Sequence, residues 1–271
     1  MELYDVRKFV RAFFPIPLQK FLLTCVRKTR GYYGLAKYKG KGTYCPCCQK
    51  SFKRFRNYPF VESGHDVKWN GNPENILCPF CMSLAHHRII CDVFSREKWL
   101  VPPMKILHFA PEQSILEWMR IHGIPVITAD YYDKLVDFKI DIQNIELQDD
   151  SMDFIICNQV LEHVPDFHRS LDELYRVLKK EGILILSVPI WSKLSETYED
   201  PSIVSPEERA AHFGQEDHYR IFGTNFESIL KEHNFAVTVA DGEQCDPCIR
   251  AVSDLMLYSD YGKIFVCKKT Q

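Results

Sequence analysis

Apolar and polar positions alternate in a way that predicts a β-α-β unit over residues 152–188. The run 154–156 is continuously apolar, as expected for a strand that is buried on both faces of a parallel sheet. A polar corner follows, and then a helix that begins at Asp166, carries leucines at helical spacing and has Gly182 as its stop signal. Residues 183–188 form the second apolar strand, so this stretch indicates an α/β fold.

Similar short apolar runs lie on both sides of this unit. They predict strands at 105–109, 125–130, 139–142, 236–240 and 263–268, of which the last two are expected to form an antiparallel pair. Helices are predicted at 83–99 and 225–233. Asn158, Glu162 and His163 follow the first strand of the unit, at the edge where open α/β sheets bind ligands. These three side chains are therefore candidates for the floor of a binding site.

The first part of the chain alternates apolar and basic residues. Pro15 and Pro17 are expected to break residues 6–30 into two short helices, because proline inside a helix removes a donor and clashes with the preceding turn. Residues 31–43 read as a basic linker. The apolar positions of the arm are Phe9, Val10, Phe13, Phe14, Leu18, Phe21, Leu22 and Leu23. Two interpretations stay open: a segment that lies on a membrane surface, and a pair of helices packed on the protein's own core. No apolar run reaches the length of about 18 residues that spans a bilayer.

Charge is distributed unevenly along the chain. The formal net charge is −2, but residues 1–56 contain 14 Lys and Arg against 2 Asp and Glu, and the remaining residues contain 20 against 34. A basic front suggests an anionic neighbour, either a membrane surface or a polyanion such as nucleic acid. A solvated arm that aids solubility is the alternative. The composition, with 46% hydrophobic residues, is that of a soluble globular protein and excludes general disorder.

The 11 cysteines occur largely in C-x-x-C pairs, and the N-terminus lacks the layout of a signal peptide. Metal ligation in a reducing cytoplasm therefore accounts for them better than disulfides do. The two C-P-x-C motifs predict a structural zinc ribbon whose ligands are Cys45, Cys48, Cys78 and Cys81. Cys47 lies inside the first motif, and a metal-free cluster of buried thiols is the alternative. Cys245 and Cys248 form a third pair that is structural or incidental, with a second metal site as the alternative.

Between the two motifs lies an aromatic segment that contains Phe52, Phe55, Tyr58, Phe60 and Trp69. These rings are expected to cover the small core of the ribbon. Stacking on single-stranded RNA, with basic neighbours, is the alternative.

A basic segment opens the helix that follows the second motif. His86, His87 and Arg88 are either spare ligands or a polar contact with the next domain. Pro102 and Pro103 mark a boundary. The predicted parts are thus an arm and linker at 1–43, a zinc ribbon and connecting helix at 44–100, and an α/β domain at 101–271.

The central motif F-D-x-I-x-x-N-x-V-L-E-H-V, followed by E-L-x-R-V-L-K-x-x-G-x-L, resembles class I S-adenosylmethionine-dependent methyltransferases of the type 11 group. The likeness extends from about Ile106 to Lys268, and L-H-F-A-P-E is similar to a loop of a branch that carries an N-terminal zinc ribbon. It implies a doubly wound, seven-stranded Rossmann-like sheet that binds S-adenosylmethionine.

The resemblance assigns a cofactor role to the loop after the first strand. His108 stands at the family's acidic position, and Ala110, Glu112 and Ser114 stand where glycines are usual, although none of them tolerates positive φ as glycine does. A degenerate loop that does not bind the cofactor is the alternative. Asp130 ends the second strand, where a carboxylate accepts both ribose hydroxyls, with a turn cap as its alternative role. Asp141 is assigned to the adenine amino group and Ile142 to the ring. The predicted cofactor-binding set is His108, Ala110, Glu112, Asp130, Tyr131, Asp141, Ile142 and Asn158.

Residues 191–223 form a polar insert at the carboxyl edge of the predicted sheet, and we expect it to cover the acceptor. A plain solvated loop is the alternative. The predicted substrate-binding residues are Tyr198, Glu199, His212, Asp217 and Arg220. His218 and His163 are the candidate general bases, because imidazole titrates nearest neutral pH. The alternative role for His163 is structural: it would position the helix that follows the strand ending at Asn158. The sequence favours this alternative.

The sequence therefore predicts a cytoplasmic methyltransferase with S-adenosylmethionine as cofactor and structural Zn²⁺. The chain lacks the N-P-P-Y corner of amino-group enzymes, so the expected acceptor is an oxygen, or else a nitrogen, of a glycan, lipid-linked sugar or small metabolite. Peripheral contact with the inner face of an anionic membrane is expected through the arm. Two other functions stay open: an RNA methyltransferase that grips RNA with its ribbon and basic arm, and a non-catalytic zinc module with a degenerate fold.

Overall fold

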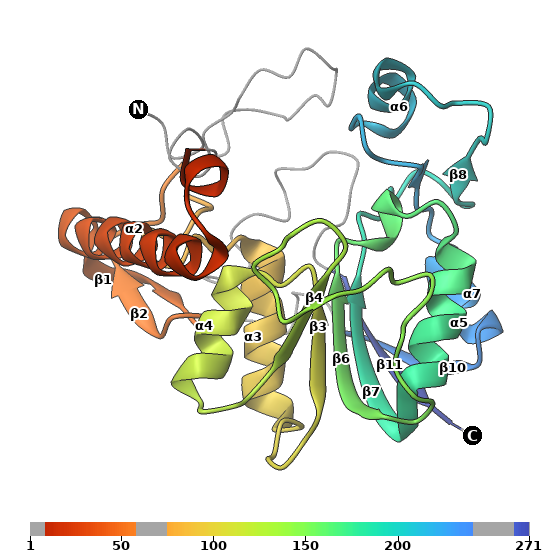
Figure 1. Ribbon diagram of the computed structural model, residues 1–271, viewed down its shortest axis with the longest axis horizontal. Coiled ribbons are helices and arrows are strands. Elements are labelled where there is room, and N and C mark those ends of the chain that lie inside the picture. Colours follow the sequence, from red (N-terminus) through yellow and green to blue (C-terminus); the bar gives the residue numbers. More distant parts are fainter. Residues whose placement is uncertain (1–8, 58–74, 241–262, 271) are drawn as a thin grey trace.

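The computed structural model describes residues 9–57, 75–240 and 263–270, which form a central sheet with helices on both faces (Figure 1). Within those ranges, no helix combines the length and the apolar character that a membrane span requires.

The central sheet has seven strands, as predicted. Its order is β10-β11-β7-β6-β3-β4-β5, in which β11 runs antiparallel to both of its neighbours and the other pairs are parallel. The strands are β3 (Ile106–Phe109), β4 (Ile127–Asp130), β5 (Phe138–Lys139), β6 (Met152–Asn158), β7 (Leu178–Ser187), β10 (Phe235–Ala240) and β11 (Ile264–Lys269). The chain moves outward from β3 in one direction and then in the other, so the order switches between β3 and β6. Ligands of open α/β sheets bind at this switch point, beyond the carboxyl ends of the strands.

Helices cover the two faces of the sheet. Helices α3 (Ala85–Glu97) and α4 (Gln113–Ile121) share a buried cluster with Phe154 and Ile156 of β6. Helices α5 (Phe167–Val177) and α7 (Phe226–Glu232) share the other cluster with Ile155 and Cys157. Alternate residues of β6 thus face opposite layers, which confirms the strand buried on both faces that its apolar run predicted.

The junction between α5 and β7 differs from the prediction. Asp166 does cap α5, since its carboxylate accepts a hydrogen bond from the Arg169 amide at 2.9 Å. The helix ends at Val177, however, and Gly182 lies within β7 as part of a bulge, where the register against β6 shifts. A Cβ on Gly182 would lie 2.7 Å from the Lys179 carbonyl oxygen. The glycine therefore marks a close backbone approach in a strand and not the end of a helix.

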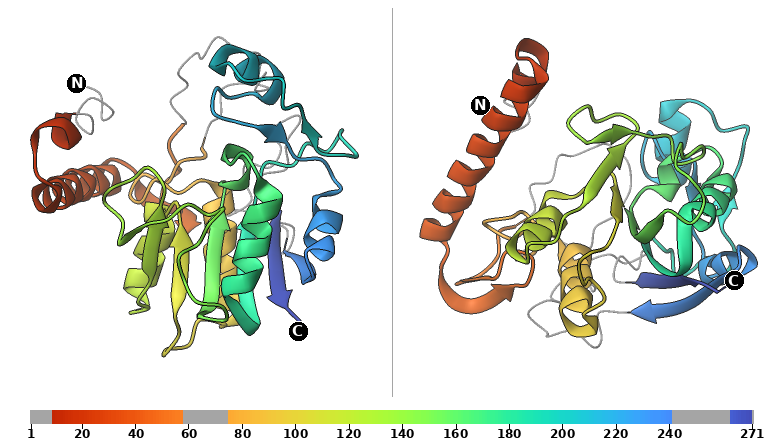
Figure 2. Two further views of the ribbon diagram at one scale, coloured as in Figure 1. Left: turned by 45° about the vertical axis from the view of Figure 1, so that its right-hand side comes forward. Right: turned by 60° about the horizontal axis from the view of Figure 1, so that its bottom comes forward.

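The N-terminal arm also differs from the prediction. A first helical segment ends at Phe13, and α2 (Ile16–Lys37) then continues for 22 residues, so the second helix is long (Figure 2). Pro15 is its N-cap and Pro17 lies in its first turn, where the missing amide donor of proline has no intrahelical partner to lose. The predicted linker is therefore taken up by the end of α2 and by β1 (Lys39–Cys45).

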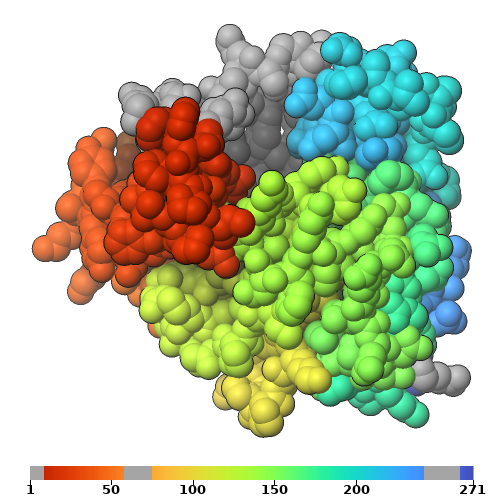
Figure 3. All heavy atoms as spheres, in the orientation of Figure 1, coloured from red at the N-terminus to blue at the C-terminus, as the bar shows by residue number. Residues whose placement is uncertain are grey.

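Helix α2 packs on the second cysteine motif through two glycines. Gly31 and Gly34 are buried, and a Cβ on Gly34 would lie 2.1 Å from the Pro79 carbonyl oxygen. Several large apolar side chains of the arm remain exposed: Phe9, Phe13, Ile16, Leu18, Phe21, Tyr32 and Tyr33. Arg11 forms an ion pair with Asp133 at 2.9 Å, which places the arm beside the loop after β4 (Figure 3). Contact of the exposed face with an anionic membrane stays a prediction.

The ribbon is built on a hairpin of β1 and β2 (Lys50–Phe52) and shares its core with the α3 side of the sheet. Phe52 and Phe55 are fully buried there, with ring centroids 6.2 Å apart. Their core role is confirmed, and buried rings cannot stack on RNA bases. Tyr58, Phe60 and Trp69 lie outside the described residues. The described residues of the ribbon share one buried cluster with α3 and the sheet, and the domain limits stay a prediction.

We predict that Gly34→Ala destabilises the protein although alanine favours helix. The added methyl would overlap the Pro79 carbonyl and force α2 away from the ribbon, at a cost of about 1–3 kcal/mol. Alanine is more favourable than glycine inside a helix, and this preference would offset up to about 1 kcal/mol of the destabilisation. Thermal unfolding followed by circular dichroism measures the difference. Thr29→Ala, on an exposed turn of the same helix, is the control and should change stability by about 0.5 kcal/mol or less. Equal stability of both variants would contradict the packing argument.

Candidate functional site

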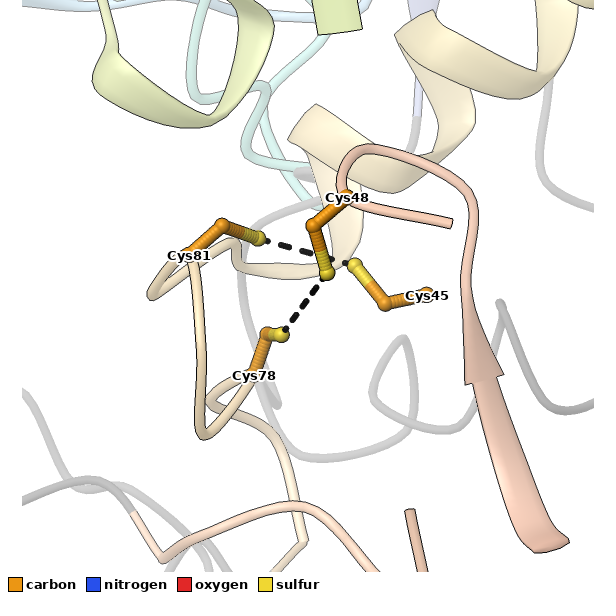
Figure 4. Close-up of side chains that lie close together, drawn as sticks. All are labelled: Cys45, Cys48, Cys78 and Cys81. Atoms are coloured by element: carbon orange, nitrogen blue, oxygen red, sulfur yellow. Dashed lines mark hydrogen bonds between the residues drawn. The ribbon is translucent and has the colours of Figure 1, made fainter. Parts of the chain in front are cut away.

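Four cysteines from two loops converge on one point (Figure 4). The Sγ atoms of Cys45 and Cys81 are 3.6 Å apart, and those of Cys48 and Cys78 are 3.7 Å apart. A tetrahedral zinc ion with Zn–S bonds of about 2.3 Å places its sulfur ligands about 3.8 Å apart. The predicted ligand set therefore comes together with the spacing that a zinc site requires, and all four atoms lie within 4.8 Å of one another.

The fifth cysteine of this region has a different environment. Cys47 is fully buried, and its thiol donates to the His87 carbonyl oxygen at 3.4 Å. It lies outside the four-cysteine group, as the spacing predicted. Ser83 supports the group instead, with its Oγ 3.2 Å from Cys45 Sγ. Cys245 and Cys248 lie outside the described residues.

Arg88 of α3 forms hydrogen bonds with the backbone of the ribbon. Its Nη1 donates to the carbonyl oxygens of Ile76 and Ser83 at 2.9 and 2.8 Å, and the guanidinium lies 4.6 Å from the centre of the Phe55 ring. The side chain is fully buried. Arg88 thus has a structural role in holding the second cysteine motif.

Two neighbouring histidines lie between the ribbon and the sheet. Burial lowers the pKa of His86 to about 4 and lowers that of His87 well below its usual value. The Leu84 amide donates to His87 Nδ1 at 2.9 Å, so the neutral ring carries its proton on Nε2. That Nε2 lies 3.7 Å from Glu112 Oε1. Of the two roles left open by the sequence, His87 therefore has the polar contact with the α/β domain, and neither histidine joins the four-cysteine group.

Glu112 is the centre of the loop after β3. His108 Nε2 lies 2.6 Å from one carboxylate oxygen, and Asn158 Nδ2 donates to the other. His108 and Asn158 are buried at the ends of β3 and β6, so the loop is tied to both strands at the switch point. Three of the predicted cofactor-binding residues are thus brought together in one network.

Ala110 corrects an expectation about this loop. It adopts φ +43°, in the left-handed region, although the loop has no glycine. Its amide donates to the Ala129 carbonyl oxygen at 2.9 Å, which holds the turn against β4. The polar network and this bond together impose a backbone conformation that the sequence alone does not favour.

The other predicted cofactor residues lie at the ends of β4 and β5. Asp130 Oδ1 accepts from the amides of Tyr132 and Asp133 at 2.6 and 2.7 Å, so the turn-cap role is present and involves one carboxylate oxygen. Tyr131 is half exposed beside it. Asp141 Oδ1 caps a turn through the Gln143 amide at 2.9 Å, and the Ile142 side chain is buried. Their roles toward a cofactor stay predictions.

A second cluster follows the carboxyl end of β6. The short helix η1 (Leu161–His163) brings Glu162 and His163 next to Asp217 and His218 of the insert. The ring centroids of the two histidines are 4.6 Å apart, and His163 Nδ1 lies 3.1 Å from Asp217 Oδ2. One ligand atom from each of Glu162, His163 and His218 lies within 4.8 Å of the others. Both candidate bases are therefore adjacent to a carboxylate that the sequence placed on the floor of the site.

Burial and neighbouring charges shift the pKa values of this cluster in different directions. Burial raises the pKa of Glu162 to about 7, and burial together with the charge of His163 lowers the pKa of His218 to about 4. Burial also acts to lower the pKa of His163, but Asp217 and Glu162 outweigh it and raise the value. At neutral pH His218 is therefore uncharged, while Glu162 is close to its midpoint.

The insert consists of β8 (Tyr198–Glu199), α6 (Pro206–Phe213) and β9 (Arg220–Ile221) and lies beyond the end of the sheet (Figure 1). Arg220 fixes it there by donating to the carbonyl oxygens of Leu161, Val164 and Pro165 at 2.6–2.7 Å and to Glu199 at 2.9 Å. The Arg220 side chain is 2% exposed. Four of its five N–H groups donate within the protein, which gives Arg220 a positioning role, and its predicted contact with substrate stays a prediction.

The remaining predicted substrate residues are more exposed. Tyr198 Oη lies 3.0 Å from His212 Nδ1, and these two side chains form a pair away from the interior. One carboxylate oxygen of Glu199 accepts a hydrogen bond from Arg220, whereas Asp217 forms an ion pair with His163. Only Asp217 of this set therefore joins the cluster at the end of β6.

The contact between His87 and Glu112 was not predicted from the sequence. The paired histidines at the start of a helix were its one signal, but no spacing rule connects them to the loop after β3.

Residues 112–186 match the family described as a methyltransferase domain. A curated protein of Streptomyces fradiae, an uncharacterized 37.1 kDa protein in transposon TN4556, is 38% identical over 111 residues. That match covers 40% of this chain and 30% of the relative, so the chain spans less than a third of that protein's length.

Two solved structures illustrate what the chain is similar to. The (4+2)-cyclase SpnF superposes with a TM-score of 0.50 at 13% identity, over 70% of this chain and 83% of that one. A 1,6-didemethyltoxoflavin-N1-methyltransferase of Burkholderia thailandensis gives a TM-score of 0.45 at 11% identity, over 69% and 79%. Likeness at this level of identity concerns the fold alone. The strand order and the likeness to SpnF show a Rossmann-like fold, and residues 112–186 within this fold match a methyltransferase domain.

Proposed function

We propose that this protein is an S-adenosylmethionine-dependent methyltransferase that acts on a hydroxyl oxygen of a glycan, a lipid-linked sugar or a small metabolite. The observation that carries the proposal is the cluster of Glu162, His163 and His218 at the carboxyl end of β6. A hydroxyl must lose its proton as its oxygen attacks the methyl carbon, so its site needs groups that accept a proton or stabilise negative charge. A neutral amine attacks through its lone pair and has no such requirement.

The donor is expected to lie along the ends of β3, β4 and β5. Asp130 caps its turn through Oδ1, which leaves Oδ2 to accept hydrogen bonds from the ribose hydroxyls. Asp141 and Ile142 follow β5, one strand further out, and we propose that they contact the adenine amino group and ring. The bound cofactor supplies an electrophilic methyl group on its sulfonium sulfur. The protein's own contribution is to hold donor and acceptor in line.

We predict that Asp130→Asn weakens binding of S-adenosylmethionine by about tenfold or more, which corresponds to loss of a charged acceptor worth about 1.5–3 kcal/mol. The amide oxygen of asparagine can still cap the turn, but its NH₂ group cannot accept from a hydroxyl. Calorimetric titration measures the affinity. Asp133→Asn makes the same change in the same loop, on a side chain that pairs with Arg11, and should bind the donor like the wild type. Equal affinity of all three proteins would contradict the ribose role.

We predict that the transferred methyl group is recovered as an O-methyl ether and that RNA is not required. Incubation with ¹³C-methyl-labelled donor and separate pools of sugars, lipid-linked sugars, small metabolites and RNA tests this. The chemical shift of the labelled carbon distinguishes an O-methyl from an N-methyl product. The buried positions of Phe52 and Phe55 argue against a stacking surface for RNA. Label recovered on nitrogen, or only from the RNA pool, would contradict the proposed acceptor.

We further propose that Cys45, Cys48, Cys78 and Cys81 hold a structural zinc ion. Four thiolates fill a tetrahedral shell, leave no position for a substrate, and join loops that have little other core of their own. The sulfur separations of 3.6 and 3.7 Å support this assignment. Zinc would thereby fix the ribbon against the start of α3, whose His87 contacts Glu112.

We predict that Cys78→Ser contains one equivalent of zinc less than the wild type and unfolds at a lower temperature, because binding of structural zinc contributes directly to folding. Metal analysis of the purified full chain and a thermal melt provide the two measurements. Cys47→Ser is the matched control, since this thiol is equally buried beside the cluster but bonds to a backbone carbonyl. An undiminished zinc content in Cys78→Ser would refute the ligand set, as would an equal loss in Cys47→Ser.

A further inference from the structure

We propose that Glu162, His163 and His218 form a second metal site, for a divalent first-row transition-metal ion, at the carboxyl end of β6. Two imidazoles and one carboxylate are a ligand set that suits such ions, in contrast to the thiolates of the ribbon. The three ligand atoms lie within 4.8 Å of one another. An ion bound tetrahedrally at about 2.1 Å needs them about 3.4 Å apart, which small side-chain rotations can provide.

The orientation of both histidines supports ligation. Imidazoles that bind a metal through one nitrogen usually donate the other N–H to a carboxylate or a backbone carbonyl. His163 Nδ1 faces Asp217 Oδ2 at 3.1 Å, and His218 Nδ1 faces the Phe213 carbonyl oxygen at 3.1 Å. One ring thus has the carboxylate partner and the other the carbonyl partner. In each case Nε2 is the nitrogen left to bind an ion.

The carboxylate of the set has an unmet requirement that an ion would satisfy. Glu162 is 2% exposed, and its Oε2 is a buried oxygen without a hydrogen-bond partner among the described residues. Burying an unpaired carboxylate oxygen is costly, and such groups are normally paired or bound to a metal. The unpaired oxygen belongs to the residue next to His163, so it lies on the same short helix as the first imidazole.

The backbone on both sides of the cluster is held in place. The Tyr219 amide donates to the Glu162 carbonyl oxygen at 2.9 Å, directly joining the insert to η1. Arg220 binds the carbonyl oxygens of Leu161 and Val164 on either side of the η1 ligands. The three ligands therefore come from two segments that are fastened together next to the cluster, as a preformed metal site requires.

The metal site would have a coordination position free for the acceptor. The catalytic role that follows rests on the proposed function. Three protein ligands leave a coordination position, and the His163 side chain is 32% exposed. An acceptor hydroxyl bound there would have a lowered pKa and release its proton to water. Its oxygen then attacks the methyl carbon: the C–O bond forms, the C–S bond breaks, and the electron pair returns to the sulfur of S-adenosylhomocysteine. The histidines are ligands in this scheme, which replaces the general-base roles predicted from the sequence.

Metal content of the full chain tests the site. Each protein is loaded with excess Zn²⁺, desalted and analysed for zinc per chain. We expect two ions in the wild type and one in Glu162→Gln and in His218→Ala, with the ion that remains showing that the ribbon is still folded. His212→Ala, which removes a histidine of the same insert outside the cluster, should retain two.

A wild-type protein with a single ion would overturn the second site. So would Glu162→Gln and His218→Ala proteins that hold as much zinc as His212→Ala. Titration with S-adenosylmethionine separates this inference from the proposed function. Two ions without donor binding contradict the methyltransferase mechanism and support the metal site, whereas donor binding with one ion contradicts the metal site alone.

Discussion

One partly buried carboxylate, that of Glu112, connects three parts of the molecule that meet at the carboxyl edge of the sheet. His108 binds it from β3, Asn158 binds it from β6, and His87 faces it from the helix that follows the ribbon. A carboxylate that is largely removed from water depends on its partners for hydrogen bonds. Glu112 therefore couples the position of the ribbon, the path of the loop after β3 and the end of β6, since a shift of any one would remove a partner of this carboxylate.

This network explains how the loop after β3 can do without glycine. An alanine in the left-handed region costs about 1–2 kcal/mol relative to its preferred conformation, and Ala110 has φ +43°. The bond from its amide to Ala129 and the anchoring of Glu112 on both strands offset that cost. The chain has thus replaced the conformational freedom of glycine with polar anchors. Its departure from the glycine pattern therefore does not by itself indicate a lost site.

The sequence was informative where structure is decided locally. The apolar run of β6 and the cap at Asp166 depend on neighbouring residues, and both are found as predicted. The four cysteines come from two distant motifs, and they were predictable because each motif has the spacing of a zinc ligand pair. Gly182 could not be placed in this way, because whether glycine ends a helix or fits a bulge depends on the strand beside it. The role of Arg220 depends on carbonyl groups more than fifty residues away, which no periodicity reveals.

In the proposed function, the donor side and the acceptor side meet at the end of one strand, β6. Asn158 ends β6 and belongs to the network of Glu112, while Glu162 begins the cluster shared with the insert only four residues later. Arg220 and Tyr219 of the insert donate hydrogen bonds to backbone carbonyls of this same turn, so the proposed acceptor side is held there as well. Methyl transfer tolerates little error in the line from acceptor through methyl to sulfur. Anchoring both sides to one buried strand end is a direct way to hold that line, because no flexible segment then lies between them.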